Sequence, residues 1–276
     1  CALPISYTIV DTMMRIDLPA ALKSGAQIRF SVAWEYAINN SKEVGGRTGS
    51  ELFEDGTVLY EIAQWFPRMV AYTHTRGWQH KQFLGSGEFT LEFGDYTVRI
   101  TAPETHVVAA TGQLLNGDDI LTEDQRKRLE QAKTADRPMF VITPADANKN
   151  ESRQAQGTKT WVFRAERVRD FAFASSPKFI WDAQGCDIQG NQVMAMSFYP
   201  KEGLQVWEEE STKAVVHALE VYSEATIEYP YPSAISVNTS NIGMEFPMIS
   251  FNGGRPKNGK MRDGAQQGMI GTIIHE

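Results

Sequence analysis

Alternating apolar and polar residues dominate the first half of the chain and predict β-structure. In the stretch 27–38, QIRFSVAWEYAI, apolar residues alternate with polar or small ones, as in a half-buried strand. The Gly94-Asp95 pair lies between two such runs and is typical of a tight hairpin turn. Many short strands separated by Gly, Asp and Pro favour a sandwich or barrel. The predicted strands occupy the stretches 27–38, 87–94, 95–103 and, as two strands, 159–176.

One polar helix interrupts these strands. In LTEDQRKRLEQAK, residues 121–133, Thr122 and Gln125 have the spacing of a capping box. The following ADANKNESRQAQGTK, residues 145–159, is polar throughout and predicts a loop.

After about residue 180 the pattern changes to a mixture of strands and helices. A long helix is predicted from about residue 203, with an apolar stripe through Trp207, Ala214 and Leu219, and Pro230 is expected to end it. Strands are predicted at 191–200, 233–240 and 243–253, and a final apolar helix from about Ala265. We therefore predict two domains, a mainly β domain over 1–182 and the α+β beginning of a second domain over 183–276.

Composition limits the possible functions. The chain of 276 residues is 42% hydrophobic and 11% aromatic, enough to bury a sizeable core. A net charge of -7 argues against general nucleic-acid binding. No apolar run of transmembrane length exists, and the first residues lack the pattern of a signal peptide. Because the chain starts with Cys1, we expect it to be a piece of a longer polypeptide.

Two short stretches carry candidate chemistry. The last residues, GTIIHE, place His275 and Glu276 at the end of an apolar helix, which is how a zinc-binding H-E-x-x-H motif begins. In that motif the His is a metal ligand and the Glu is a general base. The stretch NIGMEFPMISF places Glu245 on an apolar strand, where a carboxylate is costly unless it is paired or faces a cleft. Taken singly, a chance dipeptide and a solvent-facing edge-strand glutamate remain open alternatives.

Together these stretches resemble the M1 family of zinc aminopeptidases, which are gluzincins. That family carries G-x-M-E-N before H-E-x-x-H, and here GMEF precedes HE, with His275 thirty positions after Glu245. The resemblance extends to RDFAFASSPKFIWD, STKAVVHALEVYSEATIEYPYP, QWFPRMVAY and TAPETHVVAATGQL, and so covers nearly the whole chain. It implies a saddle-shaped, sandwich-like β-domain followed by the start of a thermolysin-like catalytic domain.

The resemblance also implies a role for each matching residue. His275 corresponds to the first zinc ligand and Glu276 to the general base that activates a zinc-bound water. Glu245 corresponds to the carboxylate that binds the free α-amino group of a peptide. Gly243 and Met244 correspond to the strand that lies along the substrate. Either Glu61 or Gln64 could add a contact to the amino group.

Departures from the family pattern accompany these matches. Ile242 and Phe246 replace the usual Gly and Asn, and the remaining zinc ligands would lie after Glu276. We therefore expect zinc and peptides with a free N-terminus to be the partners of the parent metallopeptidase, and this truncated chain to be inactive alone. The alternative is a non-catalytic binding or scaffold module that keeps the fold. The compartment stays open, with export to a bacterial periplasm as an expectation from the resemblance.

Overall fold

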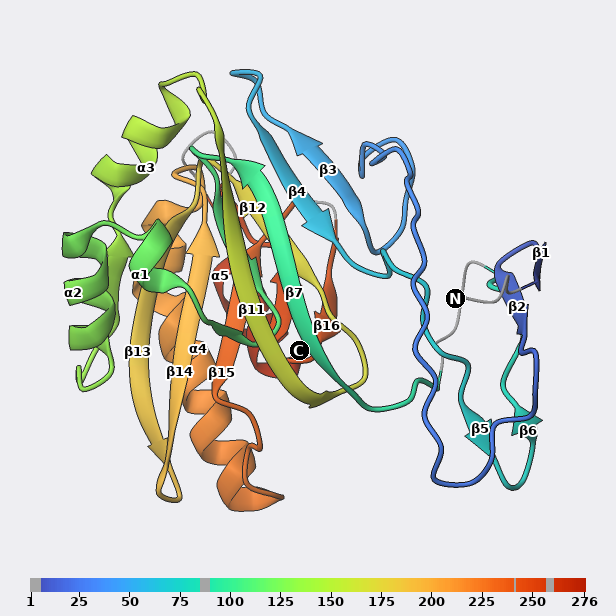
Figure 1. Cartoon of the computed structure of the whole chain (residues 1–276). Helices are drawn as coiled ribbons and strands as arrows, with labels where there is room; N and C mark the ends of the chain where they lie inside the picture. The colour runs from blue at the N-terminus through green and yellow to red at the C-terminus, as the bar shows by residue number, and fades with distance from the viewer. Residues whose placement is uncertain (1–5, 85–89, 241, 257–260) are drawn as a thin grey trace. The chain divides into compact units, whose positions relative to one another are not determined.

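The computed structural model describes residues 6–84, 90–240, 242–256 and 261–276. The chain divides into two compact units, one formed by residues 1–37 and 66–92, the other by residues 38–65 and 93–276. The elements are labelled in Figure 1. All residues of the candidate site belong to the second unit, so the following description concentrates on it.

The first unit contains two short hairpins. They are formed by β1 (Ser6–Val10) with β2 (Met13–Asp17), and by β5 (Tyr72–Thr73) with β6 (Gly77–Trp78). The predicted strand over 27–38 is wrong, because these residues are assigned to no ladder. Their alternation produces an apolar face, but Ile28, Phe30 and Trp34 remain 41–47% exposed, so little packing stabilises a strand there.

Three sheets build the second unit. Their strand orders are β10-β13-β14-β15-β17-β16, β3-β4-β12-β8 and β7-β11-β9. The strands are β3 (Gly49–Leu52), β4 (Val58–Ile62), β7 (Gly94–Pro103), β8 (Val107–Ala110), β9 (Gln113–Leu114), β10 (Met139–Ile142), β11 (Thr158–Val168), β12 (Phe173–Ser176), β13 (Ile180–Ile188), β14 (Asn191–Tyr199), β15 (Ser233–Asn238), β16 (Met244–Phe246) and β17 (Ile249–Asn252). The helices are α1 (Gly117–Ile120), α2 (Glu123–Ala132), α3 (Pro144–Glu151), α4 (Leu204–Ala225) and α5 (Ala265–His275).

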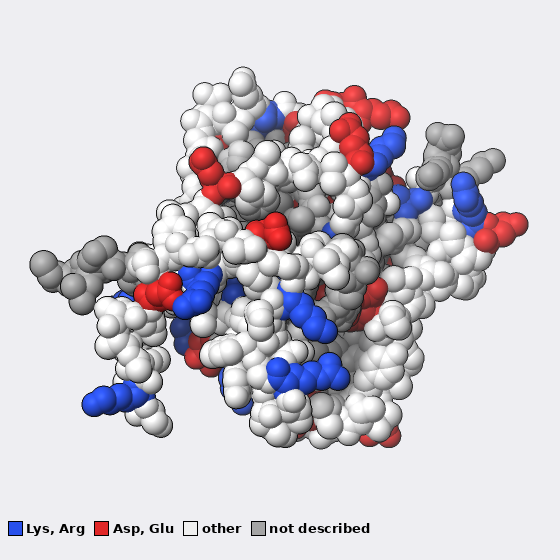
Figure 2. Space-filling view, turned by 90° about the vertical axis from the view of Figure 1, so that its right-hand side faces the viewer, with Lys and Arg blue, Asp and Glu red and all other residues white. Residues whose placement is uncertain are grey.

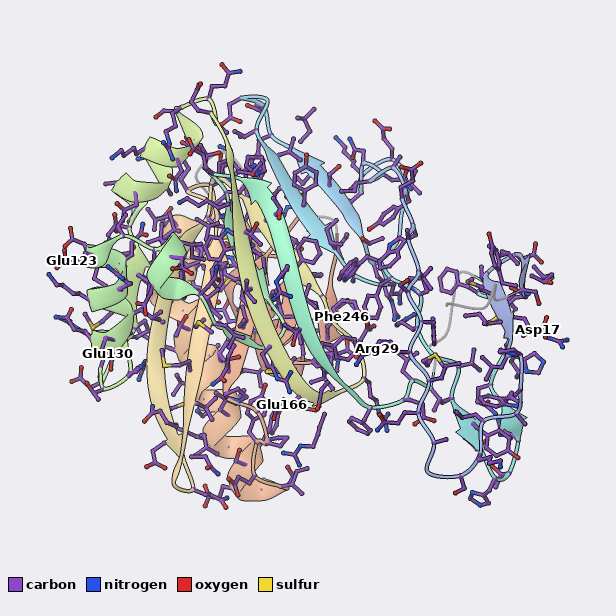
Figure 3. The ribbon with its side chains drawn as sticks, in the orientation of Figure 1. Asp17, Arg29, Glu123, Glu130, Glu166 and Phe246 are labelled. Atoms are coloured by element: carbon purple, nitrogen blue, oxygen red, sulfur yellow. The ribbon has the colours of Figure 1, made fainter. Side chains whose placement is uncertain are left out.

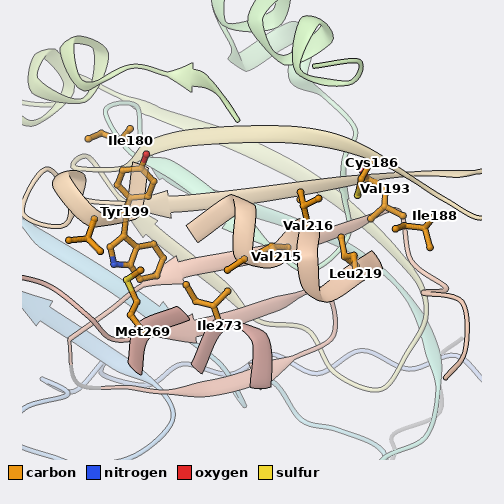
Figure 4. Close-up of a cluster of buried hydrophobic side chains, with 14 of the residues drawn as sticks. Ile180, Cys186, Ile188, Val193, Tyr199, Val215, Val216, Leu219, Met269 and Ile273 are labelled. Atoms are coloured by element: carbon orange, nitrogen blue, oxygen red, sulfur yellow. The ribbon is translucent and has the colours of Figure 1, made fainter. Parts of the chain in front are cut away.

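The six-stranded sheet supports the candidate site. Its β14, β15 and β17 run parallel, while β16 returns antiparallel to β17. Helix α4 packs on β13 and β14, and α5 packs on α4 and β17. Figure 4 shows the apolar cluster between these elements, in which Trp207, Leu219, Met269 and Ile273 are buried. Burial of this stripe, rather than helix propensity alone, stabilises α4 and α5.

The mainly β fold with an α+β second half is confirmed, with local corrections. The hairpin predicted at Gly94-Asp95 is wrong, since both residues belong to β7, which pairs with the distant β11. The loop predicted over 145–159 is also wrong in its first half, because Thr143 caps α3 through Asp146 and Pro144 occupies its first turn. Helix α2 has the predicted capping box of Thr122 and Gln125.

The predicted boundary at residue 182 stays a prediction. Residue 182 lies inside β13, and the six-stranded sheet also recruits β10 from the earlier part of the chain. Over the residues that the structure describes, no helix is long and apolar enough to cross a membrane.

Candidate functional site

The candidate site begins at a hairpin at the edge of the six-stranded sheet. Within the described part of the chain, β16 pairs only with β17, through Met244 with Phe251 and Glu245 with Ser250. The turn between the strands is held where the Thr111 hydroxyl donates to the Pro247 carbonyl over 2.9 Å. An edge strand keeps backbone groups on its outer side for another extended chain. The hairpin can therefore receive a peptide.

The residues around Glu245 explain the departures from the family pattern. Ile242 is buried, and its carbonyl accepts a hydrogen bond from the Thr239 hydroxyl, so this position serves the core. The ring of Phe246, labelled in Figure 3, packs on Phe251 with centroids 5.7 Å apart. A Cβ added at Gly243 would meet the Phe251 carbonyl at 3.8 Å, an ordinary contact. The fold itself therefore tolerates a side chain at position 243.

Helix α5 positions His275 and Glu276. It begins after Gly264, whose φ of 75° is easily reached only without a side chain, and Met269 and Ile273 bury one face. Gly254 allows close approach of the helix, since a Cβ there would lie 2.6 Å from the Met269 side chain. His275, in the last turn, is exposed, and Glu276 directly after it is half-buried.

The structure brings Glu245 and Glu276 together although they lie 31 positions apart in the sequence. A hydrogen bond joins the two carboxyl groups, with the protonated Glu276 as donor and Glu245 as acceptor. Burial, this hydrogen bond and the negative charge of Glu245 raise the pKa of Glu276 to about 7, while His275 and Arg47 oppose the rise. Such a carboxyl changes charge near neutral pH, which suits acid–base chemistry.

Glu61 lies in a separate cluster and not in the carboxyl pair. It is fully buried on β4, and both carboxylate oxygens lack a hydrogen-bond partner among the described residues. Burial and then the charge of Glu51 raise the pKa of Glu61 to about 8, and Arg255 opposes this. Gln64, the other expected amine contact, has a φ of 52° just after β4. The role of either residue with substrate stays a prediction.

Two contributors were missed from the sequence. Arg47 lies between β3 and the preceding glycines, and its charge acts on Glu276. Arg255 follows β17, forms an ion pair with Glu51 and donates to the Asn238 carbonyl over 3.1 Å. Neither residue stands in a local motif, because both act through contacts with distant segments.

The described residues do not form a metal site by themselves. No group of three or more His, Cys, Asp or Glu side chains in that part of the chain is arranged to hold a metal ion. His275 is the only zinc ligand that the sequence predicts here, whereas a catalytic zinc site uses three protein ligands. Further ligands would have to come from outside the described residues.

Comparisons with known proteins bear on the fold. No family model and no curated protein matches this chain. Among solved structures, the chain is similar to an M1 zinc metallopeptidase from Deinococcus radiodurans, with a TM-score of 0.50 and 14% identity over 98% of this chain. It is also similar to a two-domain M1 zinc metallopeptidase mutant bound to L-arginine, with a TM-score of 0.51 and 13% identity over 98% of this chain.

The chain spans about half the length of these neighbours, 50% of the first and 51% of the second. At this level of identity the likeness concerns the fold. The chain therefore has the fold of about half of an M1 zinc metallopeptidase.

Proposed function

We propose that this chain supplies the amine-recognition and general-base residues of an M1-like zinc aminopeptidase. The hydrogen-bonded pair of Glu245 and Glu276 is the observation that carries the proposal. Two carboxyl groups in contact can take different roles. One, Glu245, stays charged and binds an ammonium group, while the other, Glu276, exchanges a proton. The M1 fold and the edge position of β16 support the same interpretation.

The substrate in this proposal is a peptide with a free N-terminus. Its ammonium group binds the Glu245 carboxylate through a charge-assisted hydrogen bond. Its first residues extend along β16, where Gly243 leaves room and Met244 borders the first side chain. Glu245 is exposed at the sheet edge in the described chain, so the ammonium can reach it.

In this proposal, binding of the substrate also lowers the pKa of the general base Glu276. In the free protein, burial and the contact with Glu245 keep Glu276 largely protonated below pH 7. An ammonium that neutralises Glu245 removes the acceptor and the negative charge that raise the pKa of Glu276. Glu276 then becomes a carboxylate that takes a proton from a water molecule and later returns it to the leaving amine.

Zinc is part of the proposal through His275, which would supply one ligand. When bound, zinc polarises the peptide carbonyl and makes a water molecule more acidic. The remaining ligands come from outside these residues, so cleavage is a property of the whole protein.

Hydrolysis of an aminoacyl anilide by the full-length protein tests the proposal. Glu276→Gln should abolish cleavage, whereas Glu209→Gln, an exposed glutamate on α4, should leave it unchanged. In the parent protein kcat/KM should fall as the pH drops below about 7, because Glu276 becomes protonated. In Glu245→Gln this acid limb should move to lower pH, since the neighbouring charge is gone.

Substrates with a blocked amino group separate the two roles. Glu245→Ala should weaken binding of free-amine substrates far more than binding of N-acetylated ones. Equal losses for both would remove the amine-anchor role. A full-length protein that binds zinc but cleaves no peptide would instead favour a non-catalytic module.

A further inference from the structure

A cavity lies away from the Glu245–Glu276 pair. It has a volume of about 150 Å³ and is bordered by the turn after β7, the start of α2, the end of α3 and the start of β11. This is room for several waters or for a small anion. None of its lining residues belongs to the candidate catalytic site. Its polar lining includes Glu104, Asp146, Lys149, Arg153 and Lys159.

The carboxylates of this cavity are already engaged. Asp146 accepts hydrogen bonds from the Thr143 backbone and from Arg128, at 3.1 and 2.9 Å. Glu104 forms a long ion pair with Arg153, at 3.5 Å. Burial lowers the pKa of His106 to about 4, so this residue is neutral at pH 7, and its ring pairs with the Ser175 hydroxyl over 2.9 Å. These groups therefore leave the cavity with an excess of positive charge.

Lys159 has the least satisfied charge in this cavity. Its ammonium donates to the Ile120 carbonyl over a long 3.4 Å, and no ion pair involves it among the described residues. Burial, and then the positive charge of Arg153, lower its pKa, and only Glu104 opposes them. An ammonium in this position gains from an added anion.

Trp161 provides an independent observation. Its side chain borders the same cavity and is 2% exposed, and its indole Nε1 has no acceptor in the part of the chain that the structure describes. A buried N–H without an acceptor is rare and costs free energy. This N–H adds an unused hydrogen-bond donor to a residue that lines the cavity.

We propose that this cavity binds a small oxyanion through Lys149, Arg153 and Lys159. A phosphate or a short carboxylate presents oxygens that can pair with these cations. The site stands in an acidic chain of net charge -7, so it is a local feature and not a general anion-attracting surface.

Calorimetric titration of the full-length protein with inorganic phosphate, at constant ionic strength, tests the proposal. Saturable binding is expected, with affinity reduced at least tenfold in Lys159→Met. Lys127→Met is the matched control, because Lys127 lies on the exposed face of α2 in an ion pair with Glu123 and outside the cavity. Its affinity should equal that of the parent. Succinate in place of phosphate shows whether a carboxylate source is accepted, and saturable binding of either anion supports the site.

The indole N–H resonance of Trp161 gives a local readout. It is assigned by its loss in Trp161→Phe and should shift during the same titration. Because Lys159→Met could disturb folding, Lys149→Gln on the exposed part of α3 provides a second, milder variant with an expected several-fold loss. Absence of saturable binding of both anions, or equal affinity in the parent, Lys159→Met and Lys149→Gln, would overturn the proposal.

Discussion

Two clusters of buried charge in the second unit differ in how their charges are satisfied. The Lys178 cluster places one fully buried ammonium against Asp55, Glu151 and Glu202, at 2.5, 3.0 and 2.9 Å. The Glu61 cluster places a fully buried carboxyl beside Glu51 and Arg255, but its two oxygens have no partner in the described chain. The first cluster resembles a structural junction, whereas the second keeps hydrogen-bonding capacity unused.

Their titration differs accordingly. Burial alone would lower the pKa of Lys178, but the hydrogen bonds to its three carboxylates raise it, so the ammonium stays charged. Glu61 has only Arg255 to oppose its burial and the charge of Glu51, and its pKa rises to about 8. Burial disfavours the charged form in both clusters, but the charge is kept at Lys178 by its partners and suppressed at Glu61. The number of opposing partners, more than depth, decides the outcome.

Charged side chains elsewhere on the surface lack this organisation. Figure 2 shows acidic and basic residues interspersed over one face of the molecule. Exposed pairs of this kind contribute little, typically below about 1 kcal/mol. The contrast between the clusters is therefore a property of the interior.

The largest effect is expected from Lys178→Met. It leaves three carboxylates around an apolar side chain, and we expect the free energy of unfolding to fall by about 3 kcal/mol. Urea denaturation at pH 7 measures this. Lys201→Met is the control, because Lys201 also contacts Glu151 but is 46% exposed, and it should cost less than about 1 kcal/mol. Equal losses of unfolding free energy in the two variants would mean that the buried ion pairs of Lys178 stabilise the fold no more than the exposed pair of Lys201.

A smaller and pH-dependent effect is expected at Glu61. Its folded-state pKa of about 8 lies above the ordinary value of 4.5, so its contribution to stability is present below pH 4.5 and is lost as the pH rises through 8. Between pH 6 and 8 the ionisation of this group should lower the free energy of unfolding by about 2 kcal/mol. Glu61→Gln cannot ionise and should flatten that part of the curve. A parallel pH dependence in parent and variant would contradict the neutral state of Glu61.

The smallest effect is expected at Asp182, a buried carboxyl that does have donors. The hydroxyls of Tyr199 and Thr212 both donate to it. Burial still raises its pKa to about 7, against these hydrogen bonds, from an ordinary value of 3.8. Its stabilising effect is lost as the pH rises through 7. The free energy of unfolding should fall by about 1 kcal/mol between pH 6 and 8.

Asp182→Asn should remove that dependence, as measured by urea denaturation at several pH values. If the pH-dependent fall in the free energy of unfolding is larger for Asp182 than for Glu61, the hydroxyl donors do not explain the smaller pKa shift expected at Asp182.

Local signals were sufficient for several elements. The capping box of Thr122 predicted α2, the apolar stripe predicted α4, and alternation predicted β7, β11, β12 and β14. The same alternation failed for residues 27–38, because a strand forms only where a partner strand and a covering layer are present. Helix α4 ends at Ala225, five residues before Pro230, because the residues after Ser223 are no longer buried.

The candidate site shows the same division. The sequence by itself determined which residues are candidates for the chemistry, because GMEF and HE are local patterns whose residue types suit the proposed amine binding and proton transfer. Only the tertiary structure decided that Glu245 and Glu276 share a hydrogen bond, that Arg47 acts on them, and that Glu61 is buried with Arg255 instead. Charge interactions depend on distance and on exclusion of water, and both are set by the packing of segments far apart in the chain.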